Sequence, residues 1–296
     1  MGWRVKKPIK YLSTILSLAF AVYSGELAGQ ESPLTWRATI DWQNQILSLE
    51  IEGKEFPSGP NAPAATTAME KRIQQNLPRI LASSVATLQV DSEKTLGEGI
   101  ERSETLAAQV LGVASKGKPA LPRYSPSLVP VSVEYRFPLF EVFGSLFIQH
   151  TQPMEVPHVL QWVPSANFTG IIIYAKGELP FFGERRATRL KPALFPELFM
   201  EPMEPVFLLS MGDPAYLSRW GVAAYSSSFD ERPFLERIGY NPLRVFAIGL
   251  FGKYPTDILL SREDGYRILS RPHNRQLLKE GRILIITDTT REEINP

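Results

Sequence analysis

The sequence contains no cysteine, and this absence excludes several classes of protein at once. It rules out disulfides, thiolate metal sites, a cysteine nucleophile and the lipidated cysteine that anchors bacterial lipoproteins. Histidine is also scarce, with 3 residues in 296. His150, His158 and His273 form neither an H-E-x-x-H motif nor a pair at i, i+4 spacing. The sequence therefore predicts no metal site and no cofactor.

Motifs that carry catalysis or nucleotide binding are missing as well. There is no G-x-S-x-G elbow and no G-x-x-x-x-G-K-[ST] loop, and Gly249 and Gly252 lack the Rossmann spacing. A serine triad dispersed along the chain stays open, because triads are defined by geometry rather than by spacing. Its base would have to be one of the three histidines. We predict no catalytic residue and expect a protein that is not an enzyme.

The N-terminus has the order of segments found in a secretory signal peptide. Four basic residues come first, and the apolar stretch Tyr11–Tyr23 follows them. No acidic residue precedes Glu26. Val22 and Ser24 offer a cleavage site, with Ala19 and Ala21 as an earlier one. The alternative, a membrane anchor, needs about 20 apolar residues, more than this stretch provides. We therefore expect residues 1–24 to be removed and the protein to be exported to the periplasm or cell envelope.

The charge balance of the remaining chain argues against nucleic acid as a partner. Removing residues 1–24 takes away four of the 32 basic residues and none of the 31 acidic ones, which leaves a net charge of −3. Binding to nucleic acid by counterion release needs an excess of cations. No later segment is a transmembrane run, so no integral span is expected after cleavage. The sequence does not fix an oligomeric state.

Patterns in the first half predict a β-hairpin, three helices and a strand. Alternation at Trp36–Ile40 and an apolar run at Ile46–Ile51 flank a turn at 43–45, and residues 57–65 read as a loop. Thr67 and Glu70 match a capping box, so a helix is predicted from there to residue 88 with a kink at Pro78. A further helix capped by Ser103, a strand at 129–137 and a short apolar helix at 139–150 complete this half.

The second half predicts strands and helices without regular alternation. Strands are expected at 168–174, 206–209, 243–251 and 282–287, with an irregular segment at 177–205. A helix capped by Ser261 and another from Asn274 to Gly281 lie between them. This mixture is typical of an α+β fold. Proline density places a domain boundary near residue 160, which gives two small subdomains, 25–160 and 161–296, that can share one core.

Several residue groups are candidate sites, and a structural explanation is favoured for each. Acidic residues gather at Asp257, Glu263 and Asp264, but Ser261 caps a helix whose positive end accounts for the last two. Basic residues cluster at Arg185, Arg186, Arg189 and Lys191, as solvated loops often do. The sequon Asn167-Phe168-Thr169 precedes a buried strand. A sugar-stacking surface or ordinary core packing would explain Phe181, Phe182, Trp220 and Tyr225 equally well.

The order of weak motifs resembles the FlgP family of flagellar assembly lipoproteins and related exported spirochaete proteins. The helix Glu70–Leu88 followed by Val90-Asp91-Ser92 and Thr95, and then the strand Val131–Leu139, resemble the first. The spirochaete likeness lies in the pieces at 169–174, 191–196, 241–243, 256–264 and 281–288. The resemblance implies an envelope location and, in some members, a role in the flagellar apparatus. It does not extend to the lipid anchor, because this chain has no cysteine.

Together these observations predict a non-enzymatic, exported structural or assembly protein of the cell envelope. It would act by protein–protein contact with envelope or flagellar proteins, using exposed sheet edges as strand-addition surfaces. The alternative is a secreted hydrolase or glycan-binding module that acts on the envelope. That alternative requires a cleft lined by groups such as Asp257, Glu263 and His273.

Overall fold

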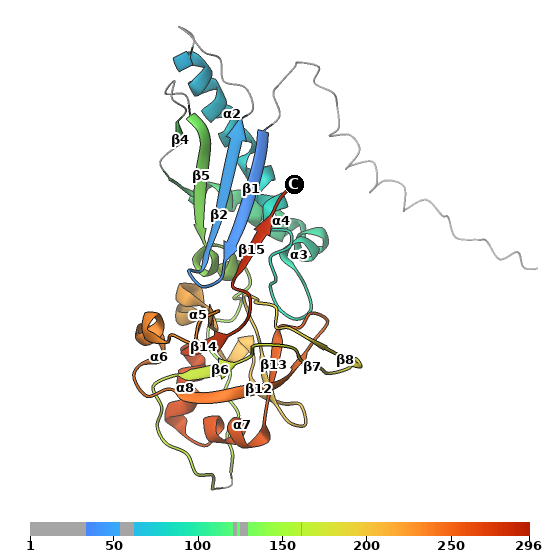
Figure 1. Cartoon of the computed structure of the whole chain (residues 1–296), viewed down its shortest axis with the longest axis vertical. Coiled ribbons are helices and arrows are strands. Elements are labelled where there is room, and N and C mark those ends of the chain that lie inside the picture. The colour runs from blue at the N-terminus through green and yellow to red at the C-terminus, as the bar shows by residue number, and fades with distance from the viewer. Residues whose placement is uncertain (1–33, 54–61, 121–122, 125–129, 161) are drawn as a thin grey trace, which may run out of the picture. The chain divides into compact units, whose positions relative to one another are not determined.

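The computed structural model describes residues 34–53, 62–120, 123–124, 130–160 and 162–296. Residues 34–296 form one compact unit. The predicted α+β class is confirmed, with helices packed on two separate sheets (Figure 1). The predicted signal peptide, residues 1–24, lies outside the described residues.

The first sheet is antiparallel and has the strand order β15-β1-β2-β5-β3, with β4 also paired to β5. Its strands are β1 (Leu34–Asp41), β2 (Ile46–Gly53), β3 (Lys118–Pro119), β4 (Arg123–Tyr124), β5 (Pro130–Pro138) and β15 (Arg291–Ile294). The predicted hairpin and the strand at 129–137 are thus confirmed as β1, β2 and β5. Every second residue points inward, so that Ile40, Leu47 and Phe137 are fully buried.

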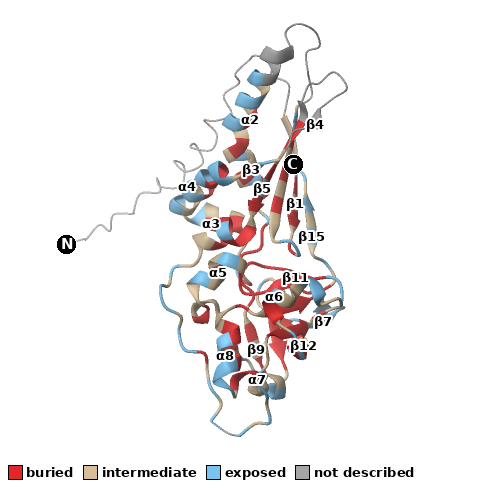
Figure 2. Cartoon of the chain, turned by 90° about the vertical axis from the view of Figure 1, so that its left-hand side faces the viewer, coloured by how far each residue is buried: buried red, intermediate tan, exposed pale blue. Residues whose placement is uncertain are grey.

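Helices cover the inner face of this sheet, where the buried residues gather (Figure 2). The long helix α2 (Ala62–Ser84) places Ile73, Leu77 and Leu81 on the sheet and contains Pro78, as predicted. The predicted start is wrong: α2 begins at Ala62, so Thr67 lies inside the helix and the end of the predicted loop is helical. Its end also comes earlier than predicted, at Ser84.

The capping box of this region lies at a second T-x-x-E sequence, 28 positions further along. Thr95 accepts a hydrogen bond from the Glu98 backbone N–H, and the Glu98 carboxylate accepts one from the Thr95 backbone N–H. This cap starts α3 (Leu96–Arg102), which the sequence analysis missed. Ser103 then caps α4 (Glu104–Val113), as predicted. Residues 139–150 form a short π turn (Leu139–Phe143) and a 3₁₀ turn (Gly144–Leu146) instead of a regular helix.

Replacing Thr95 by alanine tests the position of this cap. We expect Thr95→Ala to lower the free energy of unfolding by about 1 kcal/mol, because the Glu98 backbone N–H loses its partner. Urea unfolding followed by circular dichroism measures the change. The control is Glu93→Ala, an exposed position two residues before the cap, which should shift stability by less than about 0.5 kcal/mol. Equal effects of the two substitutions would contradict the assignment.

The second sheet is mixed and follows the order β10-β9-β13-β12-β6-β14-β11, with β7 and β8 attached beside β12. Its parallel part joins β12 (Leu243–Phe251), β6 (Ile171–Tyr174), β14 (Ile283–Ile286) and β11 (Ala224–Ser226). The other strands are β7 (Leu179–Phe181), β8 (Arg186–Thr188), β9 (Leu198–Met200), β10 (Glu204–Phe207) and β13 (Asp257–Leu260). Four of the predicted strands are confirmed here, but the segment 177–205, predicted as irregular, contains three complete short strands and the start of β10.

Four helices of the second half connect the strands of this sheet. They are α5 (Pro214–Trp220), α6 (Leu235–Ile238), α7 (Arg262–Leu269) and α8 (Pro272–Lys279). Ser261 caps α7 as predicted, because its hydroxyl accepts a hydrogen bond from the Asp264 backbone N–H. The helix predicted from Asn274 begins two residues earlier, at Pro272.

The two sheets share one continuous core, and the chain crosses between them twice. A single cluster of buried residues runs from Ile40 and Trp42 in the first half to Tyr225 and Ile285 in the second. The rings of Trp42 and Tyr225 meet edge to face with centroids 5.7 Å apart. After β14 the chain returns to the first sheet, where β15 pairs with β1. A division at residue 160 therefore does not separate the two sheets completely.

Candidate functional site

Two carboxylates whose pKa values are raised by burial meet where β9 and β13 begin. The two strands are parallel neighbours in which Leu198 pairs with Ile258, so the preceding residues, Glu197 and Asp257, lie side by side. The Glu197 backbone N–H donates to Asp257 Oδ1 over 3.1 Å. Asp257 is 2% exposed and also accepts hydrogen bonds from the hydroxyls of Thr256 and Ser92.

Burial sets the ionisation of this pair. Desolvation raises the pKa of Glu197 to about 7, although a hydrogen bond from the Leu209 backbone N–H opposes the shift. Burial likewise raises the pKa of Asp257 to about 6, against the hydrogen bonds of Ser92 and Glu197. Raised carboxyl pKa values are typical of general acids, which makes the pair a natural candidate for chemistry.

The surroundings of the pair explain it as a structural joint between the two halves of the chain. Residues 89–95, here called the junction loop, lie directly against it. Within this loop the carbonyls of Gln89 and Val90 accept hydrogen bonds from the backbone N–H groups of Leu194 and Phe195. A substrate would not reach Asp257 at 2% exposure. The pair therefore contributes to the packing of the junction loop.

The turn between β12 and β13 fixes the other side of the junction loop. The Tyr254 backbone N–H donates to the Ser92 carbonyl over 2.8 Å, and Gly252, at φ +106°, comes so close that an added Cβ would lie 2.3 Å from Ser92 Cβ. Lys253 Nζ lies 2.7 Å from Glu98 Oε1. This hydrogen bond, together with the one from Thr95, lowers the pKa of Glu98 to about 2. The capping box of α3 thus also links the two halves.

An exposed group of aromatic rings on the second sheet is the feature that packing does not explain. Tyr174 ends β6 and pairs in register with Phe246 of β12, which brings their ring centroids to 5.2 Å. Phe229 extends the group, with its centroid 5.9 Å from that of Tyr174. Phe229 is 65% exposed and Phe246 is 68% exposed. We call these three residues the aromatic surface.

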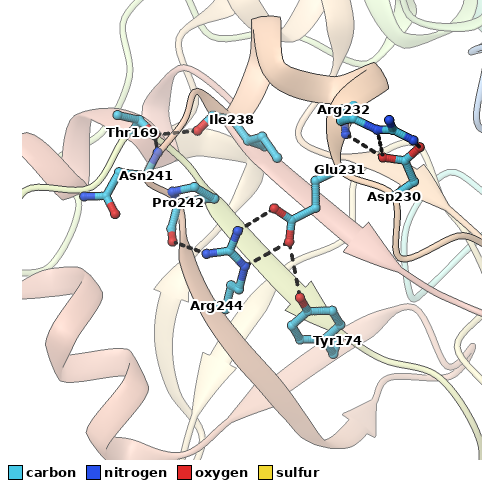
Figure 3. A network of polar contacts seen from close by, with 9 residues as sticks. All are labelled: Thr169, Tyr174, Asp230, Glu231, Arg232, Ile238, Asn241, Pro242 and Arg244. Atoms are coloured by element: carbon cyan, nitrogen blue, oxygen red, sulfur yellow. Dashed lines mark hydrogen bonds and ion pairs between the residues drawn. The ribbon is translucent and has the colours of Figure 1, made fainter.

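Charged groups lie beside the aromatic surface and hold it in place. Arg244, two residues before Phe246 on the same face of β12, donates to both carboxylate oxygens of Glu231 (Figure 3). The Tyr174 hydroxyl donates to the same carboxylate over 3.3 Å. Lys176 lies over the Phe229 ring at 5.0 Å and donates to the Ser227 carbonyl. Because these contacts fix the rings in the free protein, a partner would meet a preformed surface.

Ionisation reinforces this frame. The hydrogen bond with Glu231 raises the pKa of Arg244, and burial raises the pKa of Tyr174. Nearby, Arg232 holds the pKa of Asp230 at about 2 through a hydrogen bond and the ion pair seen in Figure 3. Arg244, Arg232 and Asp230 therefore stay charged, and Tyr174 stays neutral, across the physiological pH range.

The three histidines lie apart, each in its own surroundings. One ring nitrogen of His150 contacts the Gly212 carbonyl and one of His273 contacts the Phe168 carbonyl, both at 2.8 Å. His158 lies in the segment that connects the two halves. Within the described part of the chain, no group of three or more histidine, aspartate or glutamate residues is placed to hold a metal ion.

The acidic candidates separate in the structure. Asp257 is buried at the start of β13, whereas Glu263 and His273 are exposed on α7 and α8. Asp264 accepts a hydrogen bond from the Ser261 hydroxyl and forms an ion pair with Arg267, which agrees with its predicted place in the first turn of the helix. The residues named for a hydrolytic cleft therefore do not converge.

The basic cluster and the sequon also have structural roles. Arg186 forms an ion pair with Glu184 in the β7–β8 hairpin, while Arg185 and Arg189 are exposed and Lys191 lies over the Tyr254 ring. The Thr169 hydroxyl donates to the Ile238 carbonyl and accepts from the Asn241 backbone N–H, as Figure 3 shows.

The aromatic residues singled out from the sequence do not form a common surface. Phe181 and Tyr225 are 2% and 1% exposed and belong to the core, where Tyr225 hydrogen-bonds the Ala193 backbone. Trp220 donates to the Glu280 carbonyl, and Phe182 is exposed at the β7–β8 hairpin. The sequence analysis missed the aromatic surface, although Phe246 follows Arg244 at a strand period and therefore had to share its outward face.

Two family models match the chain, and both describe domains of one spirochaete protein, Treponema pallidum Tp0624. Residues 33–146 match the model of its N-terminal domain, and residues 170–289 match the model of its second domain. The two matches follow one another along the chain in the order of the Tp0624 domains, and they cover every described strand except β15. The spirochaete part of the resemblance is confirmed, and the FlgP part stays a prediction. No curated protein matches the chain.

The described residues contain no helix that is both long and apolar enough to cross a membrane.

Proposed function

We propose that this pair of Tp0624-type domains is an exported structural or assembly protein of the cell envelope, which acts by protein–protein contact. The observation that carries the proposal is the aromatic surface of Tyr174, Phe229 and Phe246. Aromatic side chains are enriched at the centres of protein interfaces, where burying them contributes most of the binding energy. Two phenylalanines at 65% and 68% exposure contribute no core packing that would account for their presence.

The frame around the rings fits a docking function. Arg244, Glu231 and Lys176 lie at the edge of the rings, so an apolar centre is surrounded by charge, as in many interfaces. The strands beneath are fixed by the shared core, which keeps the surface rigid. The partner we expect is an envelope protein with an apolar patch, and the FlgP resemblance makes the flagellar basal body the first assembly to test.

The test is a double substitution, Phe229→Ser with Phe246→Ser, in a tagged chain cross-linked in cells. We expect the double variant to lose the specific cross-linked envelope partner, with affinity reduced by about thirtyfold for a loss of about 2 kcal/mol. Thermal stability should stay within about 0.5 kcal/mol of the parent, because both side chains are exposed. The matched control is Leu111→Ser on α4, an apolar side chain that is 43% exposed.

Two outcomes would contradict the proposal. The double variant could cross-link to the same partner in the same yield, or the protein could be found wholly free in the soluble fraction. For the flagellar part, co-purification with basal bodies in a fixed ratio is expected, and it should disappear in cells that lack them. Binding of the parent to purified cell-wall glycan, lost in the double variant, would instead favour the glycan-binding alternative.

A further inference from the structure

A second exposed apolar feature lies in the segment that connects the two domains. Residues 154–160 and 162–165, here called the connecting loop, pass α8 and turn beyond α7 (Figure 2). The loop is fastened at both ends. The Met154 backbone N–H donates to the Ser210 carbonyl over 2.8 Å, and Ser165 Oγ donates to the Arg267 carbonyl over 2.7 Å. Among the described residues between these ends, no backbone–backbone hydrogen bond is formed.

The connecting loop turns two of its largest side chains into solvent. Leu160 is 91% exposed and Trp162 is 85% exposed, while Val156 is 5% exposed and packs on the core. The loop thus keeps an inward apolar side and a separate outward one. Burying an apolar side chain stabilises a protein, and a leucine left in water loses that gain. The outward pair therefore points to a partner that accepts protruding apolar side chains.

Positive charge lies next to the connecting loop on α8. Arg271, Arg275 and Lys279 follow one another at four-residue spacing and so share one side of the helix. Arg271 donates to the Ser165 carbonyl and Arg275 to the Leu269 carbonyl, and within the described residues none of the three has a carboxylate partner. Arg275 and Lys279 line a cavity of about 390 Å³ together with His158 and Glu155 of the connecting loop.

We propose that the connecting loop and α8 form a docking surface for a phospholipid membrane that carries anionic headgroups. Leu160 and Trp162 would enter the interfacial region, where tryptophan is enriched, and Arg275 and Lys279 would lie beside lipid phosphates. A protein partner is disfavoured, because Leu160 and Trp162 protrude from a loop rather than forming the centre of a packed surface. Glu155 is the one acidic group in the cavity wall, and the two cations Arg275 and Lys279 outweigh it.

The proposal is tested with the chain lacking residues 1–24 and with two kinds of vesicle. One kind is phosphatidylcholine, and the other is phosphatidylcholine with an equal part of phosphatidylglycerol. We expect sedimentation with the anionic vesicles only. Leu160→Ser with Trp162→Ser should weaken binding at least about tenfold. Arg275→Gln with Lys279→Gln should weaken it about thirtyfold, because each cation near an anionic surface contributes about fivefold.

Matched controls separate this surface from the rest of the protein. Phe246→Ser removes an apolar side chain of 68% exposure from the aromatic surface, and Arg185→Gln with Arg189→Gln removes two exposed cations. Neither change should alter vesicle binding. Trp162→Phe should keep most of the binding but remove the quenching of tryptophan fluorescence by brominated acyl chains. That quenching reports insertion of Trp162 itself.

Three results would overturn the membrane assignment. They are equal sedimentation with both kinds of vesicle, unchanged binding in both double variants, and quenching that persists in Trp162→Phe. Loss of a cross-linked protein in the Leu160 and Trp162 variant, without vesicle binding by the parent, would identify a protein partner instead. Because the aromatic surface is left intact in these variants, failure here leaves the proposed function untouched.

Discussion

Arg237→Met is expected to lower the free energy of unfolding by about 3 kcal/mol, which is a large loss for a single substitution. In a protein of this size that loss lowers the melting temperature by roughly 6–12 °C. Differential scanning calorimetry or urea unfolding measures it. The reason lies in what the guanidinium holds together.

Arg237 is a buried cation that binds three backbone carbonyls and no carboxylate. It is 5% exposed and donates to the carbonyls of Gly281, Trp220 and Gly221 at 2.6, 2.8 and 2.7 Å. Burial lowers its pKa to about 9, which still leaves it charged at neutral pH. The carbonyls of Trp220 and Gly221 lie at the end of α5, and that of Gly281 lies in the turn before β14. Because Arg237 belongs to α6, its side chain joins α5, α6 and β14. Gly221, at φ +74°, has no Cβ to block the approach of Phe140.

Methionine at this position keeps the volume but offers no hydrogen-bond donor. All three carbonyls would lose the guanidinium donor. Within the described residues, only the Trp220 carbonyl has another side-chain donor, the amide of Gln45 at 3.2 Å. Each buried carbonyl left without a donor costs about 1–3 kcal/mol. Arg237→Lys should recover part of the loss. An ammonium group also donates hydrogen bonds, but it cannot reach several carbonyls at once as the planar guanidinium does.

Arg219 provides a matched control, because it lies over the same Trp220 ring. Its guanidinium is 5.2 Å from the ring centroid, against 5.1 Å for Arg237. Arg219 is exposed and pairs with Glu236 at the surface. Arg219→Gln should therefore change stability by less than about 1 kcal/mol. If both variants melt at nearly the same temperature, the carbonyl network contributes nothing.

The parts of the fold that the sequence predicted correctly are those with local signals. Alternation in β1, β2, β5 and β12 and the caps of Ser103 and Ser261 depend on residues close together in the chain. The same T-x-x-E signal also misled, because it occurs at both Thr67 and Thr95. Which copy caps a helix depends on where the helix begins, and α2 begins at Ala62, so that Thr67 lies inside it.

The features that sequence reasoning missed depend on distant residues. Strand β15 has the sequence R-E-E-I, with little apolar character, and exists because it pairs with β1, which lies near the other end of the chain. The short strands β7 to β9 are likewise defined by their partners. Proximity in sequence groups Asp257 with Glu263, whereas its partner in space is Glu197, 60 positions away. The exposure of Phe229 can be predicted only once it is known which face of the second sheet the helices do not cover.

The buried carboxylates should make the protein more stable at pH 5 than at pH 8. Unfolded carboxyls titrate near pH 4, whereas burial raises the pKa of Asp257 to about 6 and that of Glu197 to about 7. The folded state therefore binds protons that the unfolded state has lost between these values. Their stabilising contribution is complete below about pH 4 and is lost as pH rises through 6 and 7. Since Glu197 is only partly buried, we expect a total of about 3 kcal/mol rather than the full sum of both shifts.

Other shifted groups do not cancel this trend. Glu98 and Asp230, with pKa values of about 2, are ionised in both states above pH 5, so their contribution is lost only at much lower pH. Burial also raises the pKa of Glu292, which adds to the trend in the same direction. Urea unfolding midpoints measured from pH 5 to pH 8 should therefore fall steadily.

The variant Glu197→Gln with Asp257→Asn isolates the pair. Both amides are neutral, and each keeps an oxygen that accepts the hydrogen bonds of Leu209, Thr256 and Ser92. We expect most of the pH dependence between 5 and 8 to disappear and stability at pH 8 to rise above that of the parent. Glu263→Gln, at an exposed position of α7, should keep the parent's slope. A double variant that is less stable than the parent at pH 8 would show that the carboxylates are needed in their charged form. The junction loop would then be held by charge, and a catalytic use of the pair would have to be considered again.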